Sequence, residues 1–260
     1  MSDNVNFHMT FPPTPAYIGR LLKIADGRMR SASEIAEETG IPEGASSGKI
    51  RPHIQYAGYM GLIRTEDFTR TPLGEVVRRE DCMLTEKLTQ MLCHIQMTSP
   101  TGAPMWRFLF HELLPENQGQ ISNALLSDAM KRRFGATAKF TPVITMYTKQ
   151  FTELKLLSAE EDSLVLHPCA FDKDLLYVYG YALLYEWESS CPEKMEITAE
   201  ELEKLKVRHT FGWSQTEEYE VLQKLCSVAV IGMNRQLVPF TIQRLVSTSF
   251  LLPKLYSLLF

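Results

Sequence analysis

The residues best suited to chemistry lie in one short stretch, SSGKIRPHIQ, where Lys49, Arg51 and His53 fall within five positions. Ammonium and guanidinium groups bind the phosphate oxygens of nucleic acids. Backbone N–H groups at the start of a helix also favour anions, and Gly48 would leave them accessible. If a helix begins inside this stretch, the sequence predicts a site for a phosphate-bearing partner.

Three further side chains extend this candidate site. Gln55 could bind an adenine edge through two hydrogen bonds if it faces outward. Arg64 and Arg70 follow in the segment LIRTEDFTRT and could reach neighbouring phosphates. The full set of candidate residues for contact with double-stranded DNA is Gly48, Lys49, Arg51, His53, Gln55, Arg64 and Arg70. The alternative, a solvated helix end on a module that contacts protein, remains open.

Two helices are expected before this stretch. Apolar residues at helical spacing predict the first over residues 18–25, with Gly27 as its stop. The second follows Ser31, which lies three residues before Glu34 as in a capping box, and ends at Gly40. A short strand is expected earlier, over residues 5–11.

The third helix and the segment after it complete a recognisable order. The third helix is marked by one apolar stripe, formed by Ile50, Ile54, Ala57 and Met60. Two short strands joined at Glu66–Asp67 follow, and then a helix with Thr71 as its cap. Helix, helix, turn, helix and two-stranded ribbon is the order of a winged helix-turn-helix, with the third helix in the recognition position.

The rest of the chain is predicted to be mainly helical. Helices are expected over 121–134 and 139–157, and LLSAEEDSLVLHP after the latter predicts a second winged-helix-like unit with an acidic turn. An offset of 94 residues aligns the apolar positions of the two units with few identities, so duplication and coincidence both remain open. Further helices and a hairpin, VIGMNRQLVPFTI, turning at Asn234–Arg235, end the chain.

These patterns predict a mainly α fold with short β-hairpins, and three domains. Residues 1–80 form the winged helix-turn-helix, 81–170 a helical domain with the second winged-helix-like unit, and 171–260 a C-terminal helical region with a hairpin. A seam is expected between Pro168 and Lys173 or over residues 189–196, where Ser, Cys, Pro and charged residues gather.

Composition restricts the class of partner. The 260 residues carry a net charge of −4, so nucleic acid would have to bind a local basic patch on an acidic body. A second basic cluster is Lys131, Arg132 and Arg133, with Lys139 and Lys149 nearby. Basic residues at a helix C-terminus also complement the helix dipole without any ligand.

Catalytic and metal-binding motifs are missing from the sequence. It contains no Walker A, GxSxG, GxGxxG, HExxH or CxxC pattern, and its five cysteines are scattered. His94 and His111 lie in apolar segments, where buried hydrogen-bonded histidines are more common than ligands. We therefore expect a protein that is not an enzyme, with no catalytic residue, metal or cofactor.

Location and assembly are indicated by weaker signals. No apolar run reaches the roughly 18 residues of a membrane span, and the N-terminus lacks the pattern of a signal peptide. We expect a cytoplasmic protein with reduced thiols and no contact with membranes. The apolar C-terminal FLLPKLYSLLF is expected to dock on the chain or to form a contact in a homo-oligomer.

Several motifs resemble an uncharacterised bacterial family, the domain of unknown function 4007 family. They occur in the expected order across most of the chain: FHMTF, GKIRPHIQYAGYMGLI, TPLGE, DCMLTEKLTQMLCHIQM, MWRFLFHEL and FGWS. The sequence departs from the family pattern at Ser46–Ser47, near Tyr56 and at His111. The resemblance implies a winged-helix protein encoded beside the sulfur-transfer enzymes of DNA phosphorothioate modification and related phage-defence systems.

Two functions therefore compete at this point. The first is a DNA-binding accessory or regulatory protein of a DNA-modification, phosphorothioation-like, or phage-defence system. The alternative is a protein-interaction scaffold whose winged helix docks a partner enzyme. A DNA binder should show a positive face across Lys49, Arg51, Arg64 and Arg70, whereas a scaffold should show an exposed apolar patch.

Overall fold

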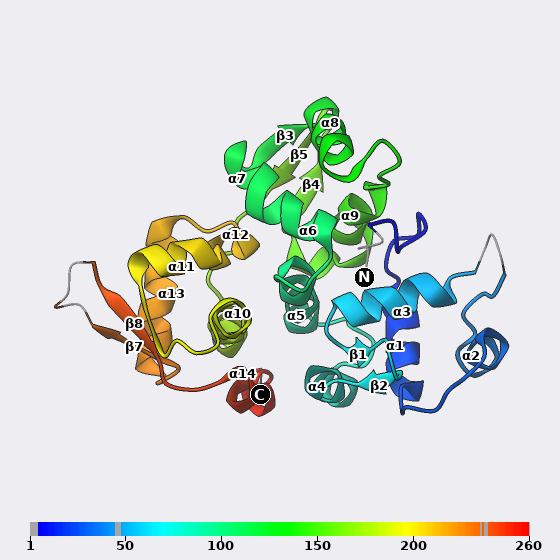
Figure 1. Ribbon diagram of the computed structural model, residues 1–260, viewed down its shortest axis with the longest axis horizontal. Helices are drawn as coiled ribbons and strands as arrows, with labels where there is room; N and C mark the ends of the chain where they lie inside the picture. The colour runs from blue at the N-terminus through cyan, green and yellow to red at the C-terminus, as the bar shows by residue number, and fades with distance from the viewer. Residues whose placement is uncertain (1–4, 45–47, 235, 237–238, 260) are drawn as a thin grey trace. The chain divides into compact units, whose positions relative to one another are not determined.

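The computed structural model describes residues 5–44, 48–234, 236 and 239–259. The chain divides into two compact units, Met1–His167 and Pro168–Phe260 (Figure 1). This boundary lies at the first of the two expected seams. The predicted division near residue 80 falls inside the first unit. Within the described residues, no helix combines the length and apolar character that a membrane span requires.

The first helix–hairpin group, residues 15–70, has the predicted order of elements. They are α1 (Pro15–Ile24), α2 (Ala32–Thr39), α3 (Ile50–Tyr59), β1 (Ile63–Arg64) and β2 (Thr69–Arg70). Ser31 and Glu34 form the expected capping box at the start of α2, and Gly40 ends that helix with a φ of 66°. The expected two-stranded ribbon is present, with Ile63 opposite Arg70 and Asp26 bridging to Thr69.

The strand expected over residues 5–11 is wrong. Residues 5–10 form turns, in which the N–H of Met9 donates to the carbonyl of Asn6 and that of Phe11 to His8. Met9 and Thr10 have φ values of 52° and 86°, which a β-strand does not allow. Phe7 and His8 are both buried, whereas a strand at a surface would bury only one of two neighbours.

The second helix–hairpin group, residues 120–166, follows a helical segment in the same unit. That segment contains α4 (Pro72–Glu80), α5 (Lys87–Thr98), α6 (Pro104–Phe108), the π-helix η1 (Leu109–Leu113) and α7 (Leu114–Glu116). The group itself contains β3 (Gln120–Ser122), α8 (Asn123–Phe134), α9 (Thr141–Thr145), the π-helix η2 (Met146–Gln150), η3 (Thr152–Leu154), β4 (Leu157–Ala159) and β5 (Ser163–Leu166). Helix α5 is buried from Leu88 to Thr98 and lies in the core of this unit.

Two helix boundaries in this group differ from the prediction. The expected helix over 121–134 begins only at Asn123, because Ser122 ends β3 and caps α8 by accepting a hydrogen bond from the N–H of Leu125. The expected helix over 139–157 is divided into α9, η2 and η3, and Leu157 already belongs to β4.

The third helix–hairpin group, residues 196–244, lies in the second unit. The elements of this unit are η4 (Lys173–Leu175), α10 (Leu176–Ser190), β6 (Glu196–Thr198), α11 (Ala199–Leu205), α12 (Val207–Phe211), α13 (Gln215–Ser227), β7 (Ile231–Asn234), β8 (Thr241–Arg244), α14 (Thr248–Leu251) and η5 (Leu252–Lys254). The predicted hairpin is present, but its expected turn includes Arg235, which lies outside the described residues.

All three groups share one connection rule. A strand or bridge is followed by two or more helical elements and then by a hairpin, and the last strand of the hairpin pairs with that strand or bridge. The sheet orders are β3–β5–β4 and β6–β8–β7, and in the first group the bridge at Asp26 takes the place of the first strand. The fold is therefore mainly helical with short antiparallel sheets, as the sequence predicts.

Candidate nucleic-acid interface

Helix α3 packs through one face, as its apolar stripe requires. Ile50, Ala57 and Met60 are buried, together with Tyr56, whose hydroxyl donates to the carbonyl of Phe11. Ile54 is only half-buried, so the predicted stripe is correct at three of its four positions. The partial exposure of Ile54 results from a cavity along which it lies.

Arg51 and Gln55 occupy the opposite face of α3. They are one helical turn apart, so their side chains project on the same side. Arg51 is exposed and Gln55 is half-exposed. Among the described residues, Arg51 takes part in no ion pair, so its positive charge is available to a partner. Both side chains therefore face outward, and their contact with DNA stays a prediction.

His53 does not lie on that face, and its expected outward position is wrong. Its side chain is fully buried beside Tyr17 and Tyr56. Its Nδ1 donates to the carbonyl of Lys49 at 2.6 Å, and its Nε2 accepts from the N–H of Thr14 at 3.0 Å. These two partners require the neutral ring. Burial also lowers the pKa of His53 to about 4, so this histidine anchors α3.

Lys49 lies directly before α3 and is half-buried. Its ammonium group is 5.5 Å from the centre of the Phe11 ring and 5.8 Å from that of Tyr17. Cation–π attraction to two rings holds the charge close to the start of the helix. Lys49 is thus less free than the sequence suggested, and its ammonium group is held over Phe11 and Tyr17, two residues before Arg51.

Gly48 is required by close packing of the backbone. A Cβ atom at this position would lie 2.3 Å from the carbonyl oxygen of Gly44, to which the N–H of Gly48 donates. The preceding Ser46–Ser47 of the candidate stretch lies outside the described residues.

The two arginines of the ribbon are largely neutralised by neighbours. Arg64 is exposed, but its Nε donates to Thr69 and lies 3.6 Å from the Asp67 carboxylate. The side chain of Arg70 is only 18% exposed; it pairs with Glu75 and donates to the carbonyl of Leu22. Arg70 therefore ties the ribbon to α1 and α4, and the expected continuous positive face across both arginines is not present.

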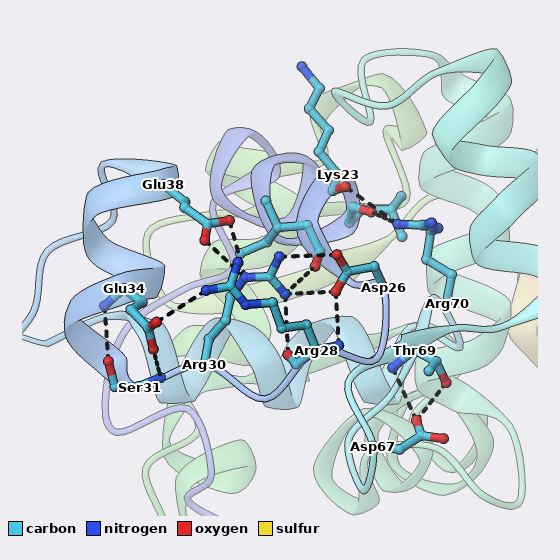
Figure 2. A network of polar contacts seen from close by, with 12 residues as sticks. Lys23, Asp26, Arg28, Arg30, Ser31, Glu34, Glu38, Asp67, Thr69 and Arg70 are labelled. Atoms are coloured by element: carbon cyan, nitrogen blue, oxygen red, sulfur yellow. Dashed lines mark hydrogen bonds and ion pairs between the residues drawn. The ribbon is translucent and has the colours of Figure 1, made fainter.

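A second network neutralises the basic residues between α1 and α2 (Figure 2). The Arg30 guanidinium donates to Asp26 at 2.7 Å and to Glu38 at 3.0 Å, and its side chain is only 5% exposed. Hydrogen bonds from Arg30 and from the N–H of Arg28 hold the pKa of Asp26 well below its usual range. Arg28 itself pairs with Glu34. These charges stabilise the connection between the helices and leave little positive potential outside.

The positive potential of this group is therefore local. The first 80 residues contain ten Lys and Arg and ten Asp and Glu, so the group has no net charge to attract an anion from a distance. At the start of α3, Arg51 is exposed and Lys49 is half-buried. Beside Arg51, between α2 and α3, lies a cavity of about 570 Å³, whose lining includes Ile35, Ile50 and Ile54 together with the charged Arg30, Glu43 and Arg51.

The helix at the same place in the other two groups differs in charge. Helix α13 begins with Ser214 and Glu217 in a capping box, and Glu217 and Glu220 are exposed. Helix α9 has no acidic residue in its first turn and no basic residue in its last. The start of α13 is acidic, whereas Lys49 lies directly before α3 and Lys139 lies two residues before α9.

In the core, His94 makes a structural contact. His94 is fully buried, and its Nδ1 lies 2.7 Å from the hydroxyl of Tyr147. In the part of the chain that the structure describes, no group of three His, Cys, Asp or Glu side chains is arranged to hold a metal ion.

Comparison with known proteins shows a shared fold. No family model matches the sequence, and no curated protein matches it. Two solved structures are similar: "Magnesium ion-bound SspB crystal structure", with 14% identity, and "SspB crystal structure", with 15%. Each has a TM-score of 0.74, and each alignment covers 97% of this chain and 87% of the other. At this identity the likeness establishes the fold alone: the chain has the fold of these two SspB structures.

Proposed function

We propose that the chain binds double-stranded DNA as an accessory or regulatory protein of a DNA-modification or phage-defence system. In this proposal the first helix–hairpin group is a winged helix-turn-helix, and α3 is its recognition helix. The order of its elements and the ribbon directly after α3 support this interpretation.

The observation that carries the proposal is the position of Arg51. It is exposed at the start of α3, two residues after Lys49 and one turn before Gln55. The first backbone N–H groups of a helix have no partner within it and point toward the same region. A phosphate there would meet the Arg51 guanidinium and a helix N-terminus, and Gln55 would be one turn further along the groove.

The kind of system in which we propose that the protein acts is indicated by the sequence. The motifs that resemble the domain of unknown function 4007 family imply a place beside DNA phosphorothioation or phage-defence enzymes, and the fold is compatible with that place. The lack of a recognised catalytic motif supports an accessory role without enzymatic activity. DNA as the partner implies a cytoplasmic protein.

The runner-up is a scaffold whose first group docks a partner enzyme. It is favoured by the balanced charge of the first 80 residues and by the apolar cavity beside α3. A protein partner would insert an apolar side chain into that cavity, and its binding would depend only weakly on salt.

A salt titration with duplex DNA distinguishes the two functions. Each phosphate contact releases condensed counterion, so Arg51→Ala should lower the slope of log affinity against log salt by about one unit. Lys49→Gln should lower the slope by about one more unit. Gln55→Ala should instead change the preference between sequences.

The matched control is Arg79→Ala. Arg79 is an exposed arginine on α4, paired with the adjacent Glu80, so this variant removes the same charge away from α3. It should bind DNA with the slope of the wild type. Absence of wild-type binding at low salt, or equal slopes for the two arginine variants, would refute the DNA-binding proposal and favour the scaffold.

A further inference from the structure

A second basic surface lies in the same unit as α3. It is formed by the exposed side chains of Lys131, Arg132 and Lys139, at the end of α8 and in the loop to α9; we call it the α8–α9 basic surface. Arg132 is paired only with Asp128, and both side chains are more than 60% exposed, so water screens this pair. Lys131 and Lys139 take part in no ion pair among the described residues.

Lys139 occupies a place equivalent to that of Lys49. Lys49 comes one residue before α3 and Lys139 two residues before α9, and each is followed three positions later by a proline, Pro52 or Pro142. The helix dipole explains basic residues in the last turn of α8, but it does not explain Lys139, which lies outside that helix.

The N-terminal segment joins this surface to α3. The side-chain amide of Asn6 donates to the carbonyl of Thr137, and its oxygen accepts from the N–H of Lys139 at 2.9 Å. The next residue, Phe7, is buried against Tyr56 and Tyr59 of α3, with ring centres 5.0 and 4.6 Å apart. Figure 1 shows this blue segment between α3 and α9. The two basic surfaces therefore belong to one packed framework.

The acidic turn of the second group lies away from the basic surface. The carbonyl of Asp162 accepts a hydrogen bond from the N–H of Asn123, so the turn with Glu160 and Glu161 is beside the start of α8. Helix α8 has 12 residues and is about 18 Å long, which separates this turn from the basic end by more than a Debye length at physiological salt.

We infer that the α8–α9 basic surface is a second contact for the phosphate backbone of the same DNA duplex that α3 binds. This inference rests on the proposed function and deepens it, because the first unit then binds one duplex at two consecutive points. The second contact has no preference for base sequence. Its cations project from the end of a helix and from a loop, and not from a helix that lies in a DNA groove, so they contact phosphates. It makes affinity depend on duplex length.

The test uses the full chain and the variant Lys131→Ala/Arg132→Ala/Lys139→Ala. On a duplex of about 20 base pairs, or two helical turns, the salt slope should fall by two to three units. On a duplex of about 10 base pairs, which offers one turn, wild type and variant should bind almost equally. A thermal melt checks that the variant is folded, and Lys139→Gln alone, which keeps the backbone bond to Asn6, should lower the long-duplex slope by about one.

The matched control removes three exposed lysines from the other unit, as Lys173→Ala/Lys204→Ala/Lys224→Ala. It changes the net charge equally and should keep the wild-type slope. If the basic-surface variant has the same long-duplex slope as wild type while Arg51→Ala still lowers it, the second contact is refuted and the proposed function stands. If the wild type binds neither duplex, both are refuted.

Discussion

At the scale of single residues, His53 shows what type and spacing can establish. Its residue type and its place among Lys49 and Arg51 suggested contact with DNA. Its position three residues after Ile50 and four before Ala57, however, places it on the buried stripe. Helical spacing in the sequence was enough to assign that face. The partners of its ring, the Thr14 N–H and the Lys49 carbonyl, depend on tertiary packing that the sequence does not contain.

The neutral state of His53 makes stability depend on pH. Its pKa is lowered to about 4 in the folded chain, so the unfolded chain takes up a proton first as pH falls below about 6.5. The free energy of unfolding therefore decreases as the pH falls from about 6.5 to about 4. At pH 5, His53 accounts for about 2 kcal/mol of this decrease. His8, with a pKa of about 4, adds a loss of the same sign.

This dependence is measured from the Tm at pH 7.5 and pH 5. His53→Gln should melt lower than wild type at pH 7.5 but lose less on acidification. The control His167→Gln changes an exposed histidine and should keep the wild-type loss. An equal loss for wild type and His53→Gln would show that His53 is not the group that titrates.

At the scale of elements, the contact between α4 and the ribbon explains the motif TPLGE. Thr71 caps α4 by accepting from the N–H of Gly74, and the N–H of Thr71 donates to the carbonyl of Leu62. A Cβ atom at Gly74 would lie 1.9 Å from that carbonyl oxygen. The helix can therefore approach the ribbon only with glycine at this position.

Gly74→Ala should destabilise the chain by roughly 1–3 kcal/mol or more, because the backbone must move to make room. The matched control is Gly232→Ala in β7, where the nearest atoms to a new Cβ would be 3.8 Å away. Denaturant unfolding of both variants measures the difference. A Gly74→Ala variant as stable as Gly232→Ala would contradict the packing of α4 on the ribbon.

The elements that the sequence predicted are those with strong local signals. Caps at Ser31 and Thr71, the stop at Gly40 and the ribbon after α3 are all confirmed. The three-residue strands β3 and β6 were missed, because so short a segment shows no alternation and forms only by pairing with β5 and β8. The internal similarity was also difficult to detect in the sequence, because no single offset aligns the two groups. Lys49 and Lys139 are 90 residues apart, whereas the apolar positions align at an offset of 94, and in the second group η2 and η3 lie between α9 and the hairpin.

At the scale of the whole molecule, the same order of a strand or bridge, helical elements and a hairpin occurs three times with different surfaces. The first and second groups share the unit Met1–His167 and carry the two basic surfaces. The third group lies in the unit Pro168–Phe260 and presents acidic residues at the start of α13. The mainly helical class was predicted from periodicity. The charge of each surface was not predicted, because ion pairs such as Arg70–Glu75, between β2 and α4, depend on how the elements pack.

Hydrogen exchange of the full chain, with and without duplex DNA, tests the central claim most directly. The first amides of α3, at Ile50 and Arg51, have no partner within the helix and should exchange quickly in the free protein. With DNA at low salt, their exchange should slow, while the start of α13 should be unchanged. Protection at α13 without protection at α3, or no protection in either helix under conditions where DNA is bound, would contradict the account.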